Sequence, residues 1–457
     1  MEIAELYKIF CEHPVITTDT RDCPEGSIFF ALKGETFNGN AFAAKALEQG
    51  CAYAVVDEQV SGNGTDGDDR IILVDDVLTT LQQLARYHRE QLGTMIVGVT
   101  GTNGKTSTKE LIATVLSEKY NVLYTQGNFN NHIGVPKTLL RLTPEHEIAV
   151  IEMGANHPGE IKTLVNIVEP DCGMITNVGR AHLGGFGNFE GVKATKGELY
   201  DFITSNSEGV IMDDGMPQAH SVFINADSDD LKEMAAQRNL HLIKYGTVEA
   251  EGLKVYGEVV ECAPFLTFQW KHNGGEMHRV ETQLIGDYNI YNMLAAATIG
   301  LTFGVSEEQV CHALSNYVPS NNRSQLTVTE KNRLVVDAYN ANPTSMAAAL
   351  KNFAAMKVDS KMCILGSMGE LGEASYDEHM KVVEQLKGIK DSEQKAKDYE
   401  MQIWLVGDEF AKTAHPFRQF GNVEDVKAAI AAEQPSGKYI LIKGSNSQKL
   451  FQLPELL

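Results

Sequence analysis

The sequence has few cysteines, and none are spaced for metal binding or redox chemistry. Its seven cysteines stand at positions 11, 23, 51, 172, 262, 311 and 363 of 457 residues. The absence of a C-x-x-C pair argues against a structural zinc site, and the odd, scattered set argues against a disulfide framework. Such cysteines are typical of reduced thiols in a cytosolic protein. We therefore expect a cytoplasmic location.

Positive charge and long apolar runs are also scarce. Lysine and arginine number 39 against 61 aspartates and glutamates, a formal net charge of −22. Because nucleic-acid surfaces need basic patches, we expect no nucleic-acid partner. No uncharged apolar run is long enough to cross a bilayer, and the first residues lack the basic and apolar regions of a signal peptide. We expect neither secretion nor membrane insertion.

What the sequence does contain is a globular composition and one distinctive stretch. Hydrophobic residues make up 43% of the chain, and its length suggests about three domains. The run Met95–Val99 predicts a buried strand, and from Leu111 on apolar residues recur at helical spacing. Between them lies TGTNGKT, whose glycines let the backbone approach a phosphate while the N–H groups of a helix start point at the anion. This pattern predicts a nucleotide phosphate site.

Lys105 and Thr106 would supply the chemistry of that site. A lysine at this position reaches the terminal phosphates, and the hydroxyl after it holds Mg²⁺. The standard motif has glycine at position 99, where this chain has Val99. A GKT triplet is common by chance, so a simple turn at a helix start is the alternative. The flanking strand and helix favour nucleotide binding.

Two further side chains follow predicted strands of the same sheet. Glu152 lies near the end of the apolar run Ile148–Met153, and His182 follows the predicted strand Met174–Val178. Ligands of open α/β sheets bind at the carboxyl ends of the strands, and a carboxylate beside a phosphate loop suits Mg²⁺. The alternative for Glu152 is a salt bridge at a strand end. His182 is a candidate only because of its place in this sheet.

Several other charged residues carry weaker signals. Lys196 and Glu198 lie in a helical pattern, where such residues usually form a solvated face. Arg21 and Lys33 flank turns near the N-terminus and could hold a diphosphate. Taken alone, each of them is more often a surface charge.

The order of predicted elements divides the chain into three α/β domains. Residues 1–93 contain short strands and helices, and the helix Val77–Leu92 would join them to the next domain. Residues 94–318 contain the phosphate loop and a period-two region, Leu253–Leu284, which predicts β-hairpins beside a parallel sheet. Residues 319–457 alternate strands and helices, which predicts a compact parallel sheet. We expect this last domain to close over the nucleotide.

Five motifs together indicate a family. They are TGTNGKT at Thr100–Thr106, GNFNNHIGVP at Gly127–Pro136, EMGANHPGEI at Glu152–Ile161, DAYNANPTSM at Asp337–Met346 and LGSMGELG at Leu365–Gly372. With these motifs the chain resembles the Mur ligases, ATP-dependent enzymes that build the stem peptide of peptidoglycan. The resemblance covers all three segments and would account for the missing glycine. Two features depart from the family pattern, an insertion from Asp213 to Val222 and a C-terminus that ends soon after Lys443.

The resemblance implies a fold and a reaction. An N-terminal mixed α/β domain would bind UDP, a central P-loop ATPase domain would hold the parallel sheet and hairpins, and a Rossmann-like domain would follow. The motifs are similar to those of the member that joins D-alanyl-D-alanine to UDP-N-acetylmuramoyl-tripeptide through an acyl phosphate, with ATP and Mg²⁺. The DNPR-type motif of the member that adds the third residue is absent. We expect a monomer, and the third residue of the tripeptide, lysine or diaminopimelate, stays open.

The resemblance also implies roles for individual residues. The implied catalytic residues are Lys105, Glu152, His182, Lys196 and Arg323. Those implied at the nucleotide are Gly101, Thr102, Asn103, Gly104, Lys105, Thr106, Ser107, Asn289, Asn292, Arg323, Asp337, Tyr339 and Asn340. Thr20, Arg21 and Lys33 would lie near the UDP end, and Asn128 and Asn131 near the muramoyl-peptide. Metal ions would be held by Thr106, Glu152, His182 and Lys196, the last as a carbamate.

Two other functions share part of this pattern. A non-catalytic nucleotide switch would use the same loop, but it would need neither Glu152, Lys196 nor the DAYNANP segment. A folylpolyglutamate-type ligase shares the loop and the mechanism. It normally lacks a UDP-binding first domain such as residues 1–93.

Overall fold

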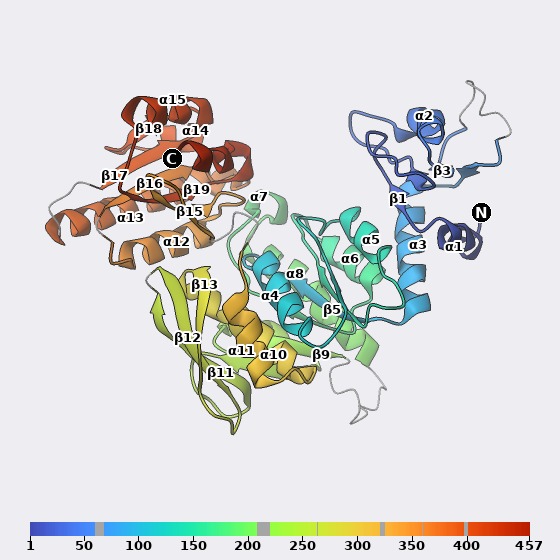
Figure 1. The fold of residues 1–457 in the computed structure, drawn as a ribbon, viewed down its shortest axis with the longest axis horizontal. Coiled ribbons are helices and arrows are strands. Elements are labelled where there is room, and N and C mark those ends of the chain that lie inside the picture. The colour runs from blue at the N-terminus through green and yellow to red at the C-terminus, as the bar shows by residue number, and fades with distance from the viewer. Residues whose placement is uncertain (60–67, 208–219, 263, 320–324, 359, 397–400) are drawn as a thin grey trace.

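The structure, a computed structural model, describes residues 1–59, 68–207, 220–262, 264–319, 325–358, 360–396 and 401–457. Three β-sheets follow one another along the chain, and each forms the centre of one domain. The first and last domains lie on opposite sides of the central one (Figure 1). The predicted three-domain α/β fold is therefore confirmed, while the boundaries at 93/94 and 318/319 stay predictions. Among the described residues, no helix is both long and apolar enough to cross a bilayer.

The N-terminal domain has a four-stranded parallel sheet in the order β1-β2-β3-β4. Its elements are α1 (Ile3–Glu12), β1 (Ile16–Thr17), β2 (Ile28–Phe30), η1 (Gly39–Phe42), α2 (Ala43–Glu48), β3 (Tyr53–Val56), β4 (Ile71–Leu73) and α3 (Val77–Leu92). Helix α3 has the predicted bounds because both ends carry local signals. The Asp76 carboxylate accepts the Thr79 N–H at 2.7 Å, and Gly93 ends the helix with φ +64°.

The central domain has a nine-stranded sheet in the order β13-β12-β11-β10-β9-β8-β5-β7-β6. From β6 at one edge of the sheet to β11, each strand is parallel to its neighbour. Strands β12 and β13 then pair antiparallel and add hairpins to the same sheet. The strands are β5 (Met95–Thr100), β6 (Val122–Tyr124), β7 (Ile148–Glu152), β8 (Cys172–Ile175), β9 (Ser221–Asn225), β10 (His241–Gly246), β11 (Leu253–Cys262), β12 (Phe265–His272) and β13 (His278–Ile285). The predicted hairpins therefore extend the parallel sheet. Most of the predicted insertion at Asp213–Val222 lies outside the described residues.

Helices cover both faces of the central sheet (Figure 1). They are α4 (Lys105–Leu116), α5 (Gly134–Leu139), α6 (Glu160–Val168), α7 (Leu183–Phe186), α8 (Phe189–Ser207), α9 (Asp229–Ala236), η2 (Asp287–Asn289), α10 (Ile290–Thr302) and α11 (Glu307–Asn316). One hydrophobic cluster runs from Leu6 of α1 through Leu84 of α3 to Leu139 of α5. Helix α3 therefore packs with both the first and the central domain.

Strand β8 begins and ends earlier than predicted. The expected strand was Met174–Val178, whereas the observed strand is Cys172–Ile175. After Ile175 the next two side chains bind the phosphate loop. Thr176 Oγ1 donates to the Asn103 carbonyl at 2.7 Å, and Asn177 Nδ2 donates to the same carbonyl at 2.9 Å. This edge of the sheet is occupied by the site.

The C-terminal domain has a six-stranded sheet in the order β14-β15-β19-β16-β17-β18. Its elements are β14 (Gln325–Val328), β15 (Arg333–Asp337), α12 (Pro343–Ala355), β16 (Lys361–Gly366), η3 (Gly372–Ala374), α13 (Ser375–Ala396), β17 (Gln402–Val406), α14 (Asp408–Ala411), β18 (Arg418–Phe420), α15 (Val423–Glu433), β19 (Tyr439–Lys443), η4 (Asn446–Gln448), η5 (Leu450–Gln452) and η6 (Pro454–Leu456). Five strands are parallel, as predicted. Strand β14 pairs antiparallel with β15, and its four residues are too few for a clear period.

Candidate functional site

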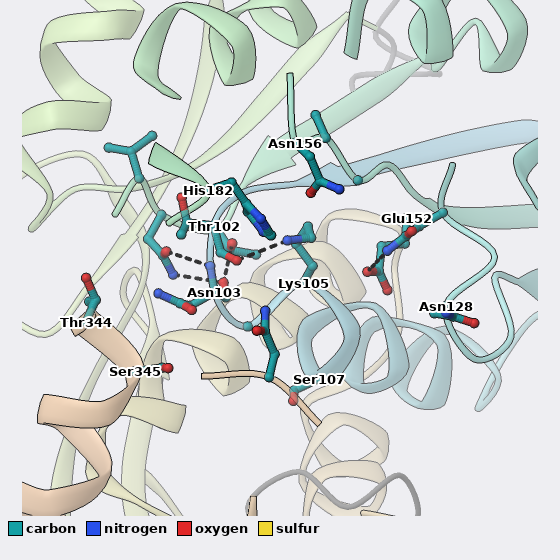
Figure 2. A pocket seen from close by; sticks show the side chains of 18 of the residues that line it. Thr102, Asn103, Lys105, Ser107, Asn128, Glu152, Asn156, His182, Thr344 and Ser345 are labelled. Atoms are coloured by element: carbon teal, nitrogen blue, oxygen red, sulfur yellow. Dashed lines mark hydrogen bonds between the residues drawn. The ribbon is translucent and has the colours of Figure 1, made fainter. Parts of the chain in front are cut away.

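A cavity of about 1060 Å³ is lined by both the central and the C-terminal domain (Figure 2). Its walls come from the carboxyl ends of central strands, from the start of α10, from the loop after β15, from the start of α12 and from the end of β19. The predicted residues that line it are Thr102, Asn103, Gly104, Lys105, Ser107, Asn128, Asn131, Glu152, His182, Asn289, Asn292, Asp337, Tyr339 and Asn340. The fold therefore brings most predicted nucleotide and metal residues to one place.

The phosphate loop has a backbone that only glycine allows at its first turn. Gly101 has φ +140°, and a Cβ there would lie 2.0 Å from Thr176 Oγ1. Lys105 begins α4, and its ammonium donates to the carbonyls of Gly101 and Thr102 at 2.7 and 3.0 Å. Val99 is a buried residue of β5, so position 99 belongs to the strand and needs no glycine.

Glu152 presents one free carboxylate oxygen in a buried setting. Its Oε1 accepts the Thr106 hydroxyl at 3.2 Å and the Asn130 amide at 2.8 Å. Its Oε2 is buried and has no hydrogen-bond partner among the residues that the structure describes. Leaving such an oxygen unpaired is costly, and a carboxylate beside a hydroxyl is the hard oxygen set that Mg²⁺ prefers. These residues therefore fit Mg²⁺, and within the described chain the alternative of a salt bridge is not seen.

Lys196 is buried, in contrast to the solvated face that its helix pattern suggests. The side chain is 2% exposed, donates to the Ala155 carbonyl at 3.3 Å and lies over the Phe186 ring. Burial lowers the pKa of Lys196 well below its ordinary value, and repulsion from Lys105 adds to this shift. Burial therefore shifts Lys196 toward its neutral form.

Glu198 does not serve as the partner of Lys196. Its two carboxylate oxygens accept the backbone N–H groups of Gly159 at 3.0 Å and Lys162 at 2.7 Å, at the start of α6. Burial raises the pKa of Glu198, although these two hydrogen bonds oppose the shift. Glu198 therefore caps a helix, as the dipole of a helix start favours.

His182 lies at the border between the central and C-terminal domains. It stands at the N-cap of α7 with φ +51°, its ring lines the cavity, and its Nδ1 contacts Glu370 of the C-terminal domain. Burial lowers the pKa of His182; Glu370 opposes this shift, whereas Lys105 and Lys196 add to it. Figure 2 shows His182 on the same side of the cavity as Lys105, with Glu152 farther along the wall. The imidazole is therefore near the phosphate loop and favours its neutral form.

The C-terminal domain reaches the phosphate loop directly. Asn342 Nδ2 donates to Asn103 Oδ1 at 2.7 Å. Asp337 and Lys443 are register partners at the ends of β15 and β19, and the Lys443 ammonium lies 2.5 Å from Asp337 Oδ2. It also donates to the Asn340 carbonyl at 3.2 Å. The predicted nucleotide residues of this domain thus lie beside the loop.

Asn289 and Asn292 tie α10 to the helix of the phosphate loop. Thr108 Oγ1 donates to Asn292 Oδ1 at 2.9 Å, and Asn292 Nδ2 donates to Asn289 Oδ1 at 2.8 Å. Asn289 Nδ2 in turn donates to the Ile285 carbonyl at 2.8 Å. This chain of hydrogen bonds fixes one wall of the cavity.

Comparison with known proteins agrees with this arrangement. Three profiles match the chain: "Mur ligase family, catalytic domain" over residues 14–89, "Mur ligase middle domain" over 99–300 and "Mur ligase, glutamate ligase domain" over 322–446. The UDP-N-acetylmuramoyl-tripeptide–D-alanyl-D-alanine ligase of Bacillus subtilis is 35% identical over 367 residues, which are 80% of this chain and 75% of the relative. The chain belongs to the Mur ligase family.

Solved structures of the family share its fold. A crystal structure of MurF from Acinetobacter baumannii has a TM-score of 0.80 and 31% identity, and it covers 96% of this chain and 93% of that one. A MurF ligase from Thermotoga maritima in complex with ADP has a TM-score of 0.81, covering 97% and 96% of the two chains. At 24% identity, the second likeness concerns the fold alone.

Two residues of this Mur ligase that sequence reasoning missed lie in the cavity wall. Asn130 holds Glu152, and its own carbonyl accepts the Gly154 N–H at 2.8 Å. Its signal in the sequence is its place in GNFNN, between Asn128 and Asn131, which were predicted to lie near the muramoyl-peptide. Lys443 holds Asp337, and its signal was a KGS segment after the last strand of the sheet. Both contacts join residues from separate strands or loops.

Some predicted residues lie away from the cavity. Gly101, Thr106 and Lys196 lie behind its wall. Thr20, Arg21 and Lys33 lie in the N-terminal domain, where Arg21 pairs with Asp19 at 2.6 Å and Lys33 pairs with two acidic residues. Arg323 lies outside the described residues. Their proposed roles in this Mur ligase stay predictions.

The loop that carries Glu370 is anchored by a buried histidine. His379 is 0% exposed; its Nε2 accepts the Met368 N–H at 3.0 Å, and its Nδ1 donates to the Ser375 carbonyl at 2.7 Å. Burial lowers the pKa of His379. Its neutral form is therefore built into the fold, because protonation would remove the acceptor for Met368.

We expect this anchor to make the C-terminal domain less stable at acid pH. The pKa of His379 in the folded protein lies below its unfolded value of about 6.5. The stabilisation from neutral His379 is therefore complete above about pH 6.5. It is lost as the pH falls from about 6.5 toward the folded pKa. The melting temperature of the wild type should fall more between about pH 7.5 and pH 5.5 than that of His379→Gln, which cannot titrate. Equal falls, measured by calorimetry, would contradict this.

Proposed function

We propose that this Mur ligase joins D-alanyl-D-alanine to UDP-N-acetylmuramoyl-tripeptide. ATP would drive the reaction, and the products would be the UDP-muramoyl-pentapeptide, ADP and phosphate. The observation that carries the proposal is a phosphate loop at Lys105 that shares a cavity with the Glu152 carboxylate. The name of the Bacillus subtilis relative supports the choice of substrates, and the ADP in the Thermotoga maritima ligase supports the nucleotide.

The chain's own residues would act by placing charge and excluding water. The tripeptide carboxylate would attack the γ-phosphate to form an acyl phosphate, and the dipeptide amine would then attack that carbonyl and release phosphate. Such phosphoryl transfer requires positioning and charge neutralisation more than covalent help. Lys105, which now donates to two loop carbonyls, would turn its ammonium to the phosphates. Arg323 would add a second cation at the γ-phosphate.

Metal ions would be held on the central domain's side of the cavity. Thr106 and Glu152 would hold one Mg²⁺, and Glu152 with His182 and Lys196 would serve a second. Bound Mg²⁺ neutralises charge on the phosphates. The buried Lys196 amine, favoured in its neutral form, would react with CO₂ to give a carbamate, which supplies an anionic oxygen of the type that Mg²⁺ prefers.

ATP and the UDP-muramoyl-tripeptide would enter from different sides. Asn289, Asn292, Asp337, Tyr339 and Asn340 would contact the nucleotide. The cavity also extends between α3 and α6, where Leu78, Gln82, Thr163 and Leu164 line it. This extension leads toward the N-terminal domain, where Thr20, Arg21 and Lys33 would hold the UDP end. Asn128 and Asn131 would then contact the muramoyl-peptide.

The test is phosphate release from ATP with each pair of UDP-muramoyl-peptide and amine. We expect turnover only when a UDP-muramoyl-tripeptide and D-alanyl-D-alanine are both present, and the rates with lysine and diaminopimelate tripeptides will identify the third residue. Equal turnover with the dipeptide-stage precursor and a free diamino acid would assign the chain to the preceding step. Turnover of a folate with glutamate would favour a folylpolyglutamate-type ligase, and ATP binding without turnover of any pair would favour a switch.

A further inference from the structure

Glu370 joins the C-terminal domain to the site through one histidine. Its carboxylate contacts His182 Nδ1, and its backbone carbonyl accepts the Gly184 N–H at 3.3 Å. Glu370 itself has φ +61°, a left-handed conformation that is unusual for a residue with a side chain. The side chain and the backbone of one residue thus hold both the ring and the turn that carries it.

The chemistry of this pair determines which nitrogen of His182 is available. An ionised carboxylate can only accept, so the hydrogen must lie on Nδ1 of the imidazole. The other nitrogen, Nε2, then keeps its lone pair. Histidines that bind metals usually donate their second ring nitrogen to a carboxylate in this way, which sets both tautomer and orientation.

We propose that Glu370 is a positioning residue that presents His182 Nε2 to the metal side of the cavity. The metal-side group, Glu152 with His182, would then be complete only when the C-terminal domain lies against the central domain. This inference rests on the proposed function, because the metal belongs to the proposed ligase reaction. It adds a residue of the C-terminal domain to a group otherwise built from the central domain.

The loop that carries Glu370 is held firmly by its own domain. Met368 N–H donates to His379, and Gly369 N–H donates to Ser445 Oγ at 2.9 Å. The first contact ties the loop to helix α13, and the second ties it to the residues just after β19. The position of Glu370 therefore follows the position of the whole domain, which is what a residue that couples docking to the site requires.

A simple electrostatic contact between domains is the competing explanation. The nearby pair of Arg180 and Glu378, 3.9 Å apart, is of that kind, because in the described part of the chain neither group is bonded to Glu152 or His182. Removing a contact that only joins the domains would change how the two domains are arranged. Such a contact would not select the tautomer of His182 or change metal affinity in the docked form.

The experiment compares the wild type with Glu370→Ala, Glu370→Gln and a control, Glu373→Ala, which removes an exposed carboxylate from η3, the short helix that follows the Glu370 loop. Two readouts are taken with ADP present: the ring ¹⁵N resonances of His182, assigned with His182→Asn, and the affinity for Mn²⁺ by electron paramagnetic resonance. We expect Glu370→Ala to lose the Nδ1–H tautomer and to bind Mn²⁺ about tenfold more weakly. Glu370→Gln keeps an accepting oxygen, so its Mn²⁺ affinity should lie between those of the wild type and Glu370→Ala. Glu373→Ala should match the wild type.

Unchanged His182 resonances and Mn²⁺ affinity in Glu370→Ala would overturn the inference, as would an equal effect in Glu373→Ala. Failure of the proposed function is distinguishable, because it would show as a wild type that binds Mn²⁺ and ADP but turns over no UDP-muramoyl-tripeptide. The tautomer and Mn²⁺ readouts do not depend on that turnover.

Discussion

Lys196→Ala should lower the ligase rate by about 100- to 1,000-fold, the usual cost of removing a group that stabilises charge in the transition state. The residue is buried next to Lys105, and burial lowers the pKa of its amine. Carbamylation of that neutral amine would give an anionic ligand in place of an ammonium, which would repel Mg²⁺. ADP affinity should be retained, because Lys196 does not line the nucleotide cavity.

Short carboxylic acids should restore part of the lost rate. Acetate or propionate would occupy the space left by the side chain and supply the oxygen that the carbamate would have supplied. Lys193→Ala is the matched control, because Lys193 lies on the same helix but pairs with Glu233 at 2.8 Å. The carbamate idea fails if carboxylates give no rescue, or if a crystal grown with bicarbonate, Mg²⁺ and an ATP analogue shows a bare amine at Lys196.

Lys443→Met should destabilise the C-terminal domain by about 3 kcal/mol and weaken ADP binding, since removing one partner of a buried ion pair leaves the other charge uncompensated. The Lys443 side chain is 1% exposed, and its partner Asp337 is 18% exposed. The unpaired Asp337 carboxylate would also lose the orientation in which it faces the cavity. Urea denaturation and titration calorimetry with ADP measure the two effects.

The double variant Asp337→Asn with Lys443→Met should recover part of the stability, because it removes both charges. It should not recover ADP affinity, since the carboxylate is gone. Lys438→Met serves as the control, because Lys438 lies just before β19 and its ammonium donates to Ser360 Oγ at 3.5 Å, with no acidic partner among the described residues. A stability change in Lys443→Met no larger than in Lys438→Met would contradict the prediction.

Local elements of this protein could be predicted because their causes are local. Helix α3 has the predicted bounds since Asp76 and Gly93 mark its ends, and β5, the glycine turn and α4 follow from periods and turn residues within about 25 positions. The long motifs also identified the family and several of the residues that line the cavity, Lys105 and Glu152 among them. What they could not supply was the partner of each side chain.

Tertiary structure decided those partners, because they come from distant parts of the chain. The contact of His182 with Glu370 spans 188 positions, and that of Asp337 with Lys443 spans 106. The second depends on strand order, since β19 inserts between β15 and β16.

Even near neighbours required the fold. Lys196 and Glu198 are two positions apart and so face different sides of their helix; only the fold shows that Lys196 is buried while Glu198 caps α6. The sequence by itself determined which residues this Mur ligase has for its chemistry. Only the packing of three sheets decided which of them meet, which are buried and which oxygen of Glu152 is left free for a cation.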